Sequence, residues 1–255
     1  MIHPTAIISP TAEVDSSCEI GAYCVIGDEV QLGKDCLLHQ HVSIQGPTVI
    51  GKRNVFYPFC SIGSKTQDLK YTQEPTYLEI GDSNNFRECV TINRGTGPEE
   101  KTIIGSNNQL LAYSHIAHNC VVGNHCIFSN NGTLAGHVVM EDYALIGGLS
   151  AVHQFCRIGK YALIGGCTKV VQDVPPYFIA DGNPAVVRSV NTVGLQRRGF
   201  SEDTITVLRK ALKLLYNPKM NTSQACSAIE ETLEGTDELS YLLHFVRSSE
   251  RGIIR

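Results

Sequence analysis

Two histidines, His115 and His118, stand three residues apart in the segment HIAHNC at 115–120. Imidazoles can ligate a metal ion, accept a proton at about pH 7, or simply lie on the exposed side of a helix. An imidazole that takes a proton from an alcohol as the alcohol attacks a carbonyl typically accelerates the reaction by about 10²- to 10⁴-fold. Which chemistry applies depends on the backbone that carries the two side chains.

A period of six residues runs through most of the chain. Stepping by six from Ile2 to Val170 meets an apolar residue at every position except Asp68, Glu74 and Pro98. A helix favours a spacing of about 3.6 residues and a half-buried strand a spacing of about 2, so this period indicates short strands that alternate with corners. Glycine often follows the apolar residue and asparagine is common nearby, and we expect both to adopt the tight or left-handed backbone of a corner.

The ten cysteines show no C-x-x-C spacing, so neither a disulfide framework nor a zinc site is indicated. Most of them occupy one position of the six-residue period. We expect these seven to be small buried side chains: Cys18, Cys24, Cys36, Cys60, Cys120, Cys126 and Cys156.

The period resembles that of the hexapeptide-repeat family, whose chains form a left-handed parallel β-helix with three hexads in each coil. The resemblance implies an all-β left-handed parallel β-helix over residues 1–187, with inserted loops near 66–79 and 94–103. After residue 187 the period ends and apolar residues recur at helical spacing. A small C-terminal α-helical domain is therefore expected at 188–255, with helices near 201–216, 222–234 and 237–248 and Ser201 as the first N-cap.

Coil geometry brings distant polar residues together. One coil above His118 is Gly136, and a glycine there leaves a backbone N–H open to an oxyanion. A band about 10 Å tall should therefore form on one face, consisting of His115, His118, His137, His153 and Gln154. This histidine band favours acid–base chemistry over a metal site, because no acidic or thiolate partner shares the spacing.

Charge and hydropathy exclude several classes of function. The formal net charge is -4 and the pI about 6.1, which gives no global argument for nucleic-acid binding. No leader-like segment and no run of about 18 apolar residues occurs, so we expect a cytoplasmic protein without membrane insertion. Residues 188–219 nevertheless carry seven Lys or Arg against Glu202 and Asp203, which suits an acidic protein partner.

Several motifs resemble the UDP-N-acetylglucosamine O-acyltransferase family over the whole chain: QDLKY (67–71), VTINRGT (90–96), YSHIAHNC (113–120), LAGHV (134–138), AVHQFCRIG (151–159), GLQRRGF (194–200) and RGIIR (251–255). The resemblance implies a homotrimer with active sites between its subunits. It also implies that the protein moves an (R)-3-hydroxyacyl chain from acyl carrier protein to the 3-hydroxyl of UDP-N-acetylglucosamine, the first step of lipid A biosynthesis.

The resemblance also implies a role for each matching residue. His118 matches the general base, and the N–H of Gly136 matches the donor to the oxyanion. Gly166 matches the position that limits the length of the acyl chain. Contacts to the sugar nucleotide or the acyl donor are implied at Asp68, Lys70, His115, His137, His153, Gln154, Asn191, Arg197 and Arg198. No metal ion or other cofactor is implied.

Three positions depart from the family's pattern. Asn93 replaces a common histidine and Val193 an acidic residue, which leaves open a 3-amino sugar nucleotide as the acceptor, with an amide as the product. Asn119 stands where some relatives have aspartate beside the base, and an amide stabilises an imidazolium less than a carboxylate does. Other candidates are the related N-acyltransferase of the same pathway, a hexapeptide-repeat zinc carbonic anhydrase and a structural protein without activity. The N-acyltransferase carries an additional N-terminal uridine-binding domain, whereas here the hexads begin at Ile2.

Overall fold

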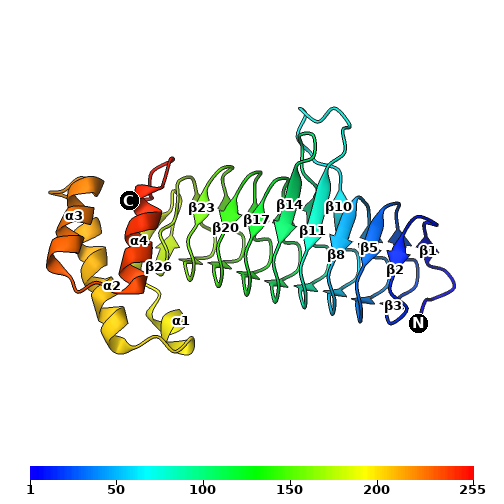
Figure 1. Cartoon of the computed structure of the whole chain (residues 1–255), viewed down its shortest axis with the longest axis horizontal. Helices are drawn as coiled ribbons and strands as arrows, with labels where there is room; N and C mark the ends of the chain where they lie inside the picture. Colours follow the sequence, from blue (N-terminus) through cyan, green and yellow to red (C-terminus); the bar gives the residue numbers. More distant parts are fainter.

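The computed structural model describes all 255 residues as a long prism of coiled strands, with four helices beyond its C-terminal end (Figure 1). The prism is a left-handed parallel β-helix, as predicted. Successive strands pass in turn to three sheets, here called I, II and III, and each strand pairs with the strand one coil away.

Each coil contributes one short strand to each sheet, except the last, which has no strand in sheet II. Sheet I consists of β1 (Ile7–Ile8), β4 (Val25–Ile26), β7 (Ser43–Ile44), β10 (Ser61–Ser64), β13 (Thr91–Asn93), β16 (His115–Ile116), β19 (Thr133–Leu134), β22 (Ala151–Val152) and β25 (Lys169–Val170). Sheet II consists of β2 (Glu13–Val14), β5 (Val30–Leu32), β8 (Thr48–Ile50), β11 (Tyr77–Ile80), β14 (Lys101–Ile104), β17 (Val121–Val122), β20 (Val139–Met140) and β23 (Arg157–Ile158).

Sheet III closes the prism and ends beside the helices. It consists of β3 (Glu19–Ile20), β6 (Leu37–Leu38), β9 (Val55–Phe56), β12 (Asn85–Phe86), β15 (Gln109–Leu110), β18 (Ile127–Phe128), β21 (Leu145–Ile146), β24 (Leu163–Ile164), β26 (Phe178–Asp181) and the antiparallel β27 (Val186–Val190). The three edges of the prism are called corners I–II, II–III and III–I.

The apolar residue of each hexad points into the prism and stacks on its equivalents in neighbouring coils. Ile92 pairs with Ile116, which pairs with Leu134, and all three are fully buried. Phe56 and Phe86 stack inside the prism with 4.8 Å between ring centroids. The seven cysteines of the period are buried free thiols, as expected, and Cys120 donates to the Ala135 carbonyl at 3.1 Å.

The expectation for glycine was wrong at most positions. Among the glycines that follow a core residue only Gly63 has a positive φ, while most left-handed residues are non-glycine corner residues such as His137 (φ 60). The glycines are needed for close approach instead: a Cβ on Gly33 would lie 2.7 Å from the Gly51 carbonyl oxygen of the next coil. Packing between coils, rather than backbone freedom, therefore selects glycine.

Two insertions leave the prism at corner I–II. The first lies between β10 and β11 and the second between β13 and β14, and Figure 1 shows them projecting together beside β11 and β14. Equivalent residues of neighbouring coils are 30 positions apart in the sequence across the first insertion and 24 apart across the second. After the insertions they are 18 apart. The insertions touch each other, since Thr96 Oγ1 donates to Thr66 Oγ1 at 2.8 Å.

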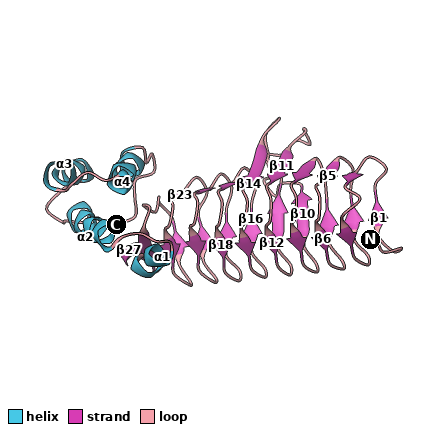
Figure 2. Cartoon of the chain, turned by 60° about the horizontal axis from the view of Figure 1, so that its bottom comes forward, coloured by secondary structure: helices cyan, strands magenta, loops and turns pink.

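Helices follow the prism at the C-terminal end, as Figure 2 shows. They are α1 (Thr192–Arg197), α2 (Glu202–Leu215), α3 (Thr222–Thr232) and α4 (Asp237–Arg247). Ser201 caps α2 as predicted, with its side chain accepting from the Thr204 N–H. The short α1 was not predicted, because its six residues are too few to show a helical period. The helices pack on one another and on Tyr177 and Phe178 at the end of the prism.

Candidate active site

The histidine band lies along corner I–II, beside both insertions. His118, Gly136 and Gln154 follow β16, β19 and β22, which are paired strands of successive coils. Each of the three residues therefore lies one coil above the one before it. His118 is largely buried, with 12% of its side chain exposed. The adjacency inferred from coil counting is present, because the Gly136 backbone lies directly against the His118 ring.

Asn119 orients the His118 ring. The two side chains meet through His118 Nδ1 and Asn119 Oδ1 at 2.9 Å, and the same Oδ1 accepts the Thr96 N–H at 3.1 Å. An oxygen at this place is an acceptor only, so the imidazole proton is assigned to Nδ1. The other nitrogen, Nε2, then carries the lone pair that a general base needs.

Gly136 leaves room for the His118 ring and has a backbone N–H that is free to donate. A Cβ at this position would lie 2.5 Å from both Cε1 and Nε2 of His118, so any side chain here displaces the ring. The backbone N–H of Gly136 has no hydrogen-bond partner in the chain. A buried N–H without a partner beside a basic nitrogen can bind a developing oxyanion.

The first insertion brings a carboxylate to the base. Asp68 Oδ2 lies 3.8 Å from His118 Nε2, a separation too long for a direct hydrogen bond. Its Oδ1 accepts the Lys70 N–H at 2.9 Å, and its N–H donates to Thr66 Oγ1 at 3.1 Å. This local turn aims the carboxylate at the ring. Asn93 anchors the base of the insertion, because its buried amide donates to the Lys65 carbonyl at 3.1 Å.

The other band residues differ in environment. His115 is half-buried on β16, where burial lowers the pKa of its imidazole and Thr91 Oγ1 lies 2.7 Å from Nδ1. Burial also lowers the pKa of His137, whose ring is perpendicular to that of His118 at 5.2 Å. His153 and Gln154 are exposed one coil further on, and His153 Nδ1 donates to the Gln154 carbonyl at 3.2 Å.

Four of the predicted site residues lie elsewhere on the chain. Asn191, Arg197 and Arg198 line a hollow of about 280 Å³ beside corner II–III, and Gly166 lies on corner III–I. Asn191 is buried and caps α1, since its Oδ1 accepts from Gly194 and its Nδ2 donates to the Tyr161 carbonyl. One chain therefore does not bring these residues to His118.

An aromatic stack in the same hollow was missed by the sequence analysis. His125, Tyr143 and Tyr161 occupy corner II–III in successive coils, with centroids 4.7 and 4.8 Å apart and rings nearly parallel. The Arg198 guanidinium lies 4.7 Å from the Tyr143 centroid. Their common position in successive coils was the signal that could have revealed the stack.

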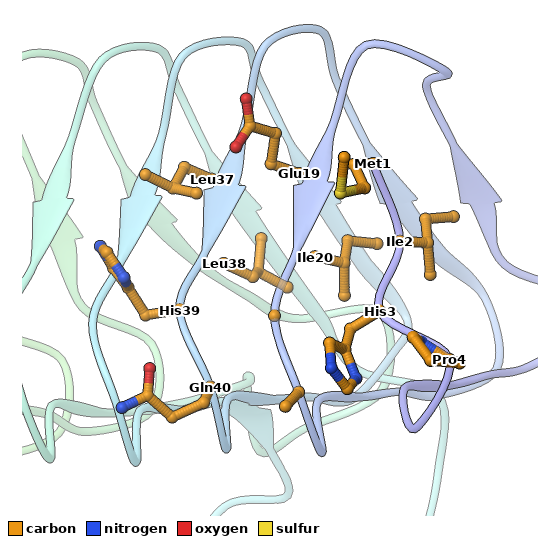
Figure 3. Close-up of a pocket in the computed structure, with 12 residues that line it drawn as sticks. Met1, Ile2, His3, Pro4, Glu19, Ile20, Leu37, Leu38, His39 and Gln40 are labelled. Carbon is orange, nitrogen blue, oxygen red and sulfur yellow. The ribbon is translucent and has the colours of Figure 1, made fainter.

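Other features of the molecule lie outside this site. An open hollow of about 580 Å³ on the first coils of sheet III includes His3 and His39, which Figure 3 shows on separate coils. Within the chain, no three His, Cys, Asp or Glu side chains are grouped so that they could hold a metal ion. None of the four helices has the length and apolar character required to cross a bilayer.

Comparison with known proteins agrees with this fold. A family described as UDP N-acetylglucosamine O-acyltransferase, domain 2, matches residues 173–254, and one described as bacterial transferase hexapeptide repeats matches residues 101–136. LpxA from Acinetobacter baumannii is 44% identical, with a TM-score of 0.96 over 100% of this chain and 99% of its own.

Two further structures are similar over the full length of both chains. LpxA from Bacteroides fragilis, a UDP-N-acetylglucosamine acyltransferase, is 39% identical with a TM-score of 0.97. The UDP-N-acetylglucosamine acyltransferase of Arabidopsis is 35% identical with a TM-score of 0.89. Each similarity covers 100% of both chains, so prism and helices are matched together.

Proposed function

The chain belongs to the UDP-N-acetylglucosamine acyltransferase family of lipid A biosynthesis, and from that premise we propose its donor, acceptor position and catalytic base. It transfers an (R)-3-hydroxyacyl chain from acyl carrier protein to the 3-hydroxyl of UDP-N-acetylglucosamine, in the cytoplasm. The observation that carries the proposal is that two free groups lie side by side: Nε2 of His118, and the backbone N–H of Gly136, which has no partner.

His118 and Gly136 divide the reaction between them. Nε2 of His118 accepts the proton of the sugar 3-hydroxyl as its oxygen bonds to the thioester carbon. The Gly136 N–H donates to the oxyanion of the tetrahedral intermediate. The carbon–sulfur bond then breaks, and the imidazolium returns its proton to the leaving thiolate. Asp68, held 3.8 Å from Nε2, is placed to accept a hydrogen bond from the sugar beside the reacting hydroxyl.

We propose that the complete site forms between copies of the chain. Gly166, Arg198 and His118 lie on different corners, so one substrate reaches all three only between subunits. Exposed apolar residues also follow corner III–I, where Tyr23, Phe59, Tyr113 and Leu149 are 59–66% exposed. A contact between different corners forms a ring when the rotation between copies closes, and the family resemblance implies a ring of three copies.

The acyl carrier protein is proposed to dock on the basic region 188–219. Among its seven Lys and Arg, only Arg209 has an ion-pair partner, Glu202 at 2.6 Å. A second hollow, of about 580 Å³, is lined by Arg188, Arg209 and Lys213 next to Asn191. Arg188 and Lys213 have no ion-pair partner, and unpaired cations around a hollow favour an acidic partner by electrostatic steering.

Purified protein with UDP-N-acetylglucosamine and a series of 3-hydroxyacyl carrier proteins should yield a 3-O-acylated sugar nucleotide, identified by mass spectrometry and fragmentation. The 3-amino analogue is assayed in parallel. An exclusive amide product would replace the proposed acceptor with the amino sugar, and no transfer to either sugar would refute the proposed function.

Gly166 is proposed to set the length of the acyl chain. Its φ is not in the left-handed region, and a Cβ there would meet only the Gly148 carbonyl oxygen, at 3.4 Å. Since the backbone does not require glycine, we expect Gly166→Met to fold. It should lower kcat/KM about 10- to 100-fold for the longest donor that the unchanged protein accepts, because the side chain occupies the space of the chain end.

The control for Gly166→Met is Gly235→Met, at a glycine with no atoms within 4 Å of the added Cβ. Competition between long and short donors, resolved by mass spectrometry, measures the preference. An unchanged preference in Gly166→Met would contradict a role in chain length.

A further inference from the structure

The amide of Asn119 joins His118 to a carboxylate outside the coils. On one side Oδ1 of Asn119 contacts His118 Nδ1 at 2.9 Å, and on the other Nδ2 donates to Oε2 of Glu100 at 2.6 Å. Glu100 belongs to the second insertion and directly precedes β14. The insertion thereby places a negative charge one side chain away from the proposed base.

Glu100 and the Thr96 N–H together fix which end of the Asn119 amide faces His118. In the observed orientation Oδ1 also accepts the Thr96 N–H at 3.1 Å. If the amide were turned over, its NH₂ group would oppose the Thr96 N–H and its oxygen would oppose the carboxylate, and both contacts are repulsive. The carboxylate therefore keeps an acceptor against Nδ1 of His118, and this acceptor holds the ring proton on Nδ1.

The Glu100 carboxylate is itself held in place. Its Oε2 accepts the Gly97 N–H at 2.8 Å, and a Cβ on Gly97 would lie 2.9 Å from the carboxyl carbon. The hydrogen bond from Gly97, followed by that from Asn119, lowers the pKa of the Glu100 carboxyl. Glu100 is therefore an anion at pH 7, although its side chain remains exposed to solvent.

We propose that Glu100 is a positioning residue for His118, acting through Asn119 to keep Nε2 free and to stabilise the imidazolium that forms during acyl transfer. The inference rests on the proposed function and deepens it. An asparagine beside the base can orient the ring but contributes no charge. Here the negative charge comes from Glu100, which contacts Asn119 on the side away from His118. Residues that contact a reacting group through another residue commonly tune its reactivity.

Several other titratable groups lie around His118. Asp68 Oδ2 lies 3.8 Å from Nε2, and the His137 ring is 5.2 Å away. His115 shares the same segment, and the Lys70 charge acts on His137. A test of Glu100 must therefore leave these groups unchanged and compare variants only at the outer position.

Glu100→Gln keeps an oxygen that can accept from Asn119 and Gly97 but removes the charge. We expect kcat to fall about 3- to 10-fold with little change in KM, a modest effect because the carboxylate is exposed. The acidic limb of the kcat/KM profile should also move to lower pH, since an imidazolium forms less readily without a nearby anion. A purely structural role would lower kcat without moving the limb.

The neighbouring Glu99 provides the matched control. Its carboxylate accepts from the Tyr77 hydroxyl at 3.2 Å and has no contact with Asn119, so Glu99→Gln should behave like the unchanged protein. Asn119→Asp alone would set two carboxylates against each other. Adding Glu100→Gln replaces that repulsion by an amide donor, so the double variant should be more active than either single variant.

Histidine-selective ¹⁵N NMR decides the role of Glu100 without relying on activity. The His118 ring signals are identified by their loss in His118→Gln. In Glu100→Gln their titration should move to lower pH relative to the unchanged protein, and in Glu99→Gln it should not. An unmoved titration together with an unmoved pH profile would overturn the proposal. If the unchanged protein transfers no acyl group, the proposed function fails, whereas the titration still decides whether Glu100 acts on His118.

Discussion

Replacing His118 with alanine will lower kcat for acyl transfer by about 10²- to 10⁴-fold, the range that a positioned general base contributes. Although the ring is largely buried, its only side-chain hydrogen bond is to Asn119, so the coils around it should remain folded. Initial rates with saturating donor and acceptor measure the loss. Circular dichroism and thermal unfolding measured on the same preparation check the fold.

A histidine outside the site provides the control substitution. It shows whether the loss of activity is specific to His118 or follows the loss of any imidazole. His244 is exposed on α4, outside the histidine band, so His244→Ala should retain the rate of the unchanged protein. Turnover by His118→Ala at the unchanged rate would remove His118 from the mechanism, whatever the product of the reaction.

Replacing Gly136 with alanine will lower kcat about 10²-fold while leaving the fold nearly as stable as before. The added Cβ would lie 2.5 Å from two atoms of the His118 ring, so the ring must rotate away. Rotation of one side chain costs the fold little. A displacement of about 1 Å at the reacting nitrogen is, however, sufficient for a loss of this size.

Gly27→Ala is the control for this substitution, because it also lies at corner I–II and its added Cβ would meet neighbours only at 3.4 Å or beyond. Thermal unfolding and initial rates are measured on both variants. Equal activities in the two would show that the approach of Gly136 to His118 is unimportant. A large drop in unfolding temperature confined to Gly136→Ala would point instead to a structural role.

The period of six was sufficient to predict the coils and the meeting of His118 with Gly136. An uninterrupted repeat fixes which residues lie one coil apart, so contacts within residues 104–170 follow from counting. Contacts made by the insertions do not follow from it. Glu100 meets Asn119, and Asp68 approaches His118, through turns whose shape depends on local hydrogen bonds such as those to Gly97 and Lys70.

The sequence analysis did not assign the predicted site residues to separate corners, although counting by 18 already separates Gly166 from His118. Motif resemblance grouped Gly166 and Arg198 with His118, because residues that serve one substrate are matched together. Coil geometry places them on separate corners of one chain. Resemblance implies which residues serve one substrate, whereas coil geometry gives their places on a single chain.

The register of the coils limits where this chain can change in length. Both insertions leave and rejoin at corner I–II, so Ile92 and Ile116 point inward just as Ile62 does. One residue added within a strand would instead turn the core side chain of that strand toward solvent. The corner that carries His118 is thus the place where the fold admits new sequence. The two carboxylates that we propose to act on His118, from Asp68 and Glu100, are both supplied by such additions.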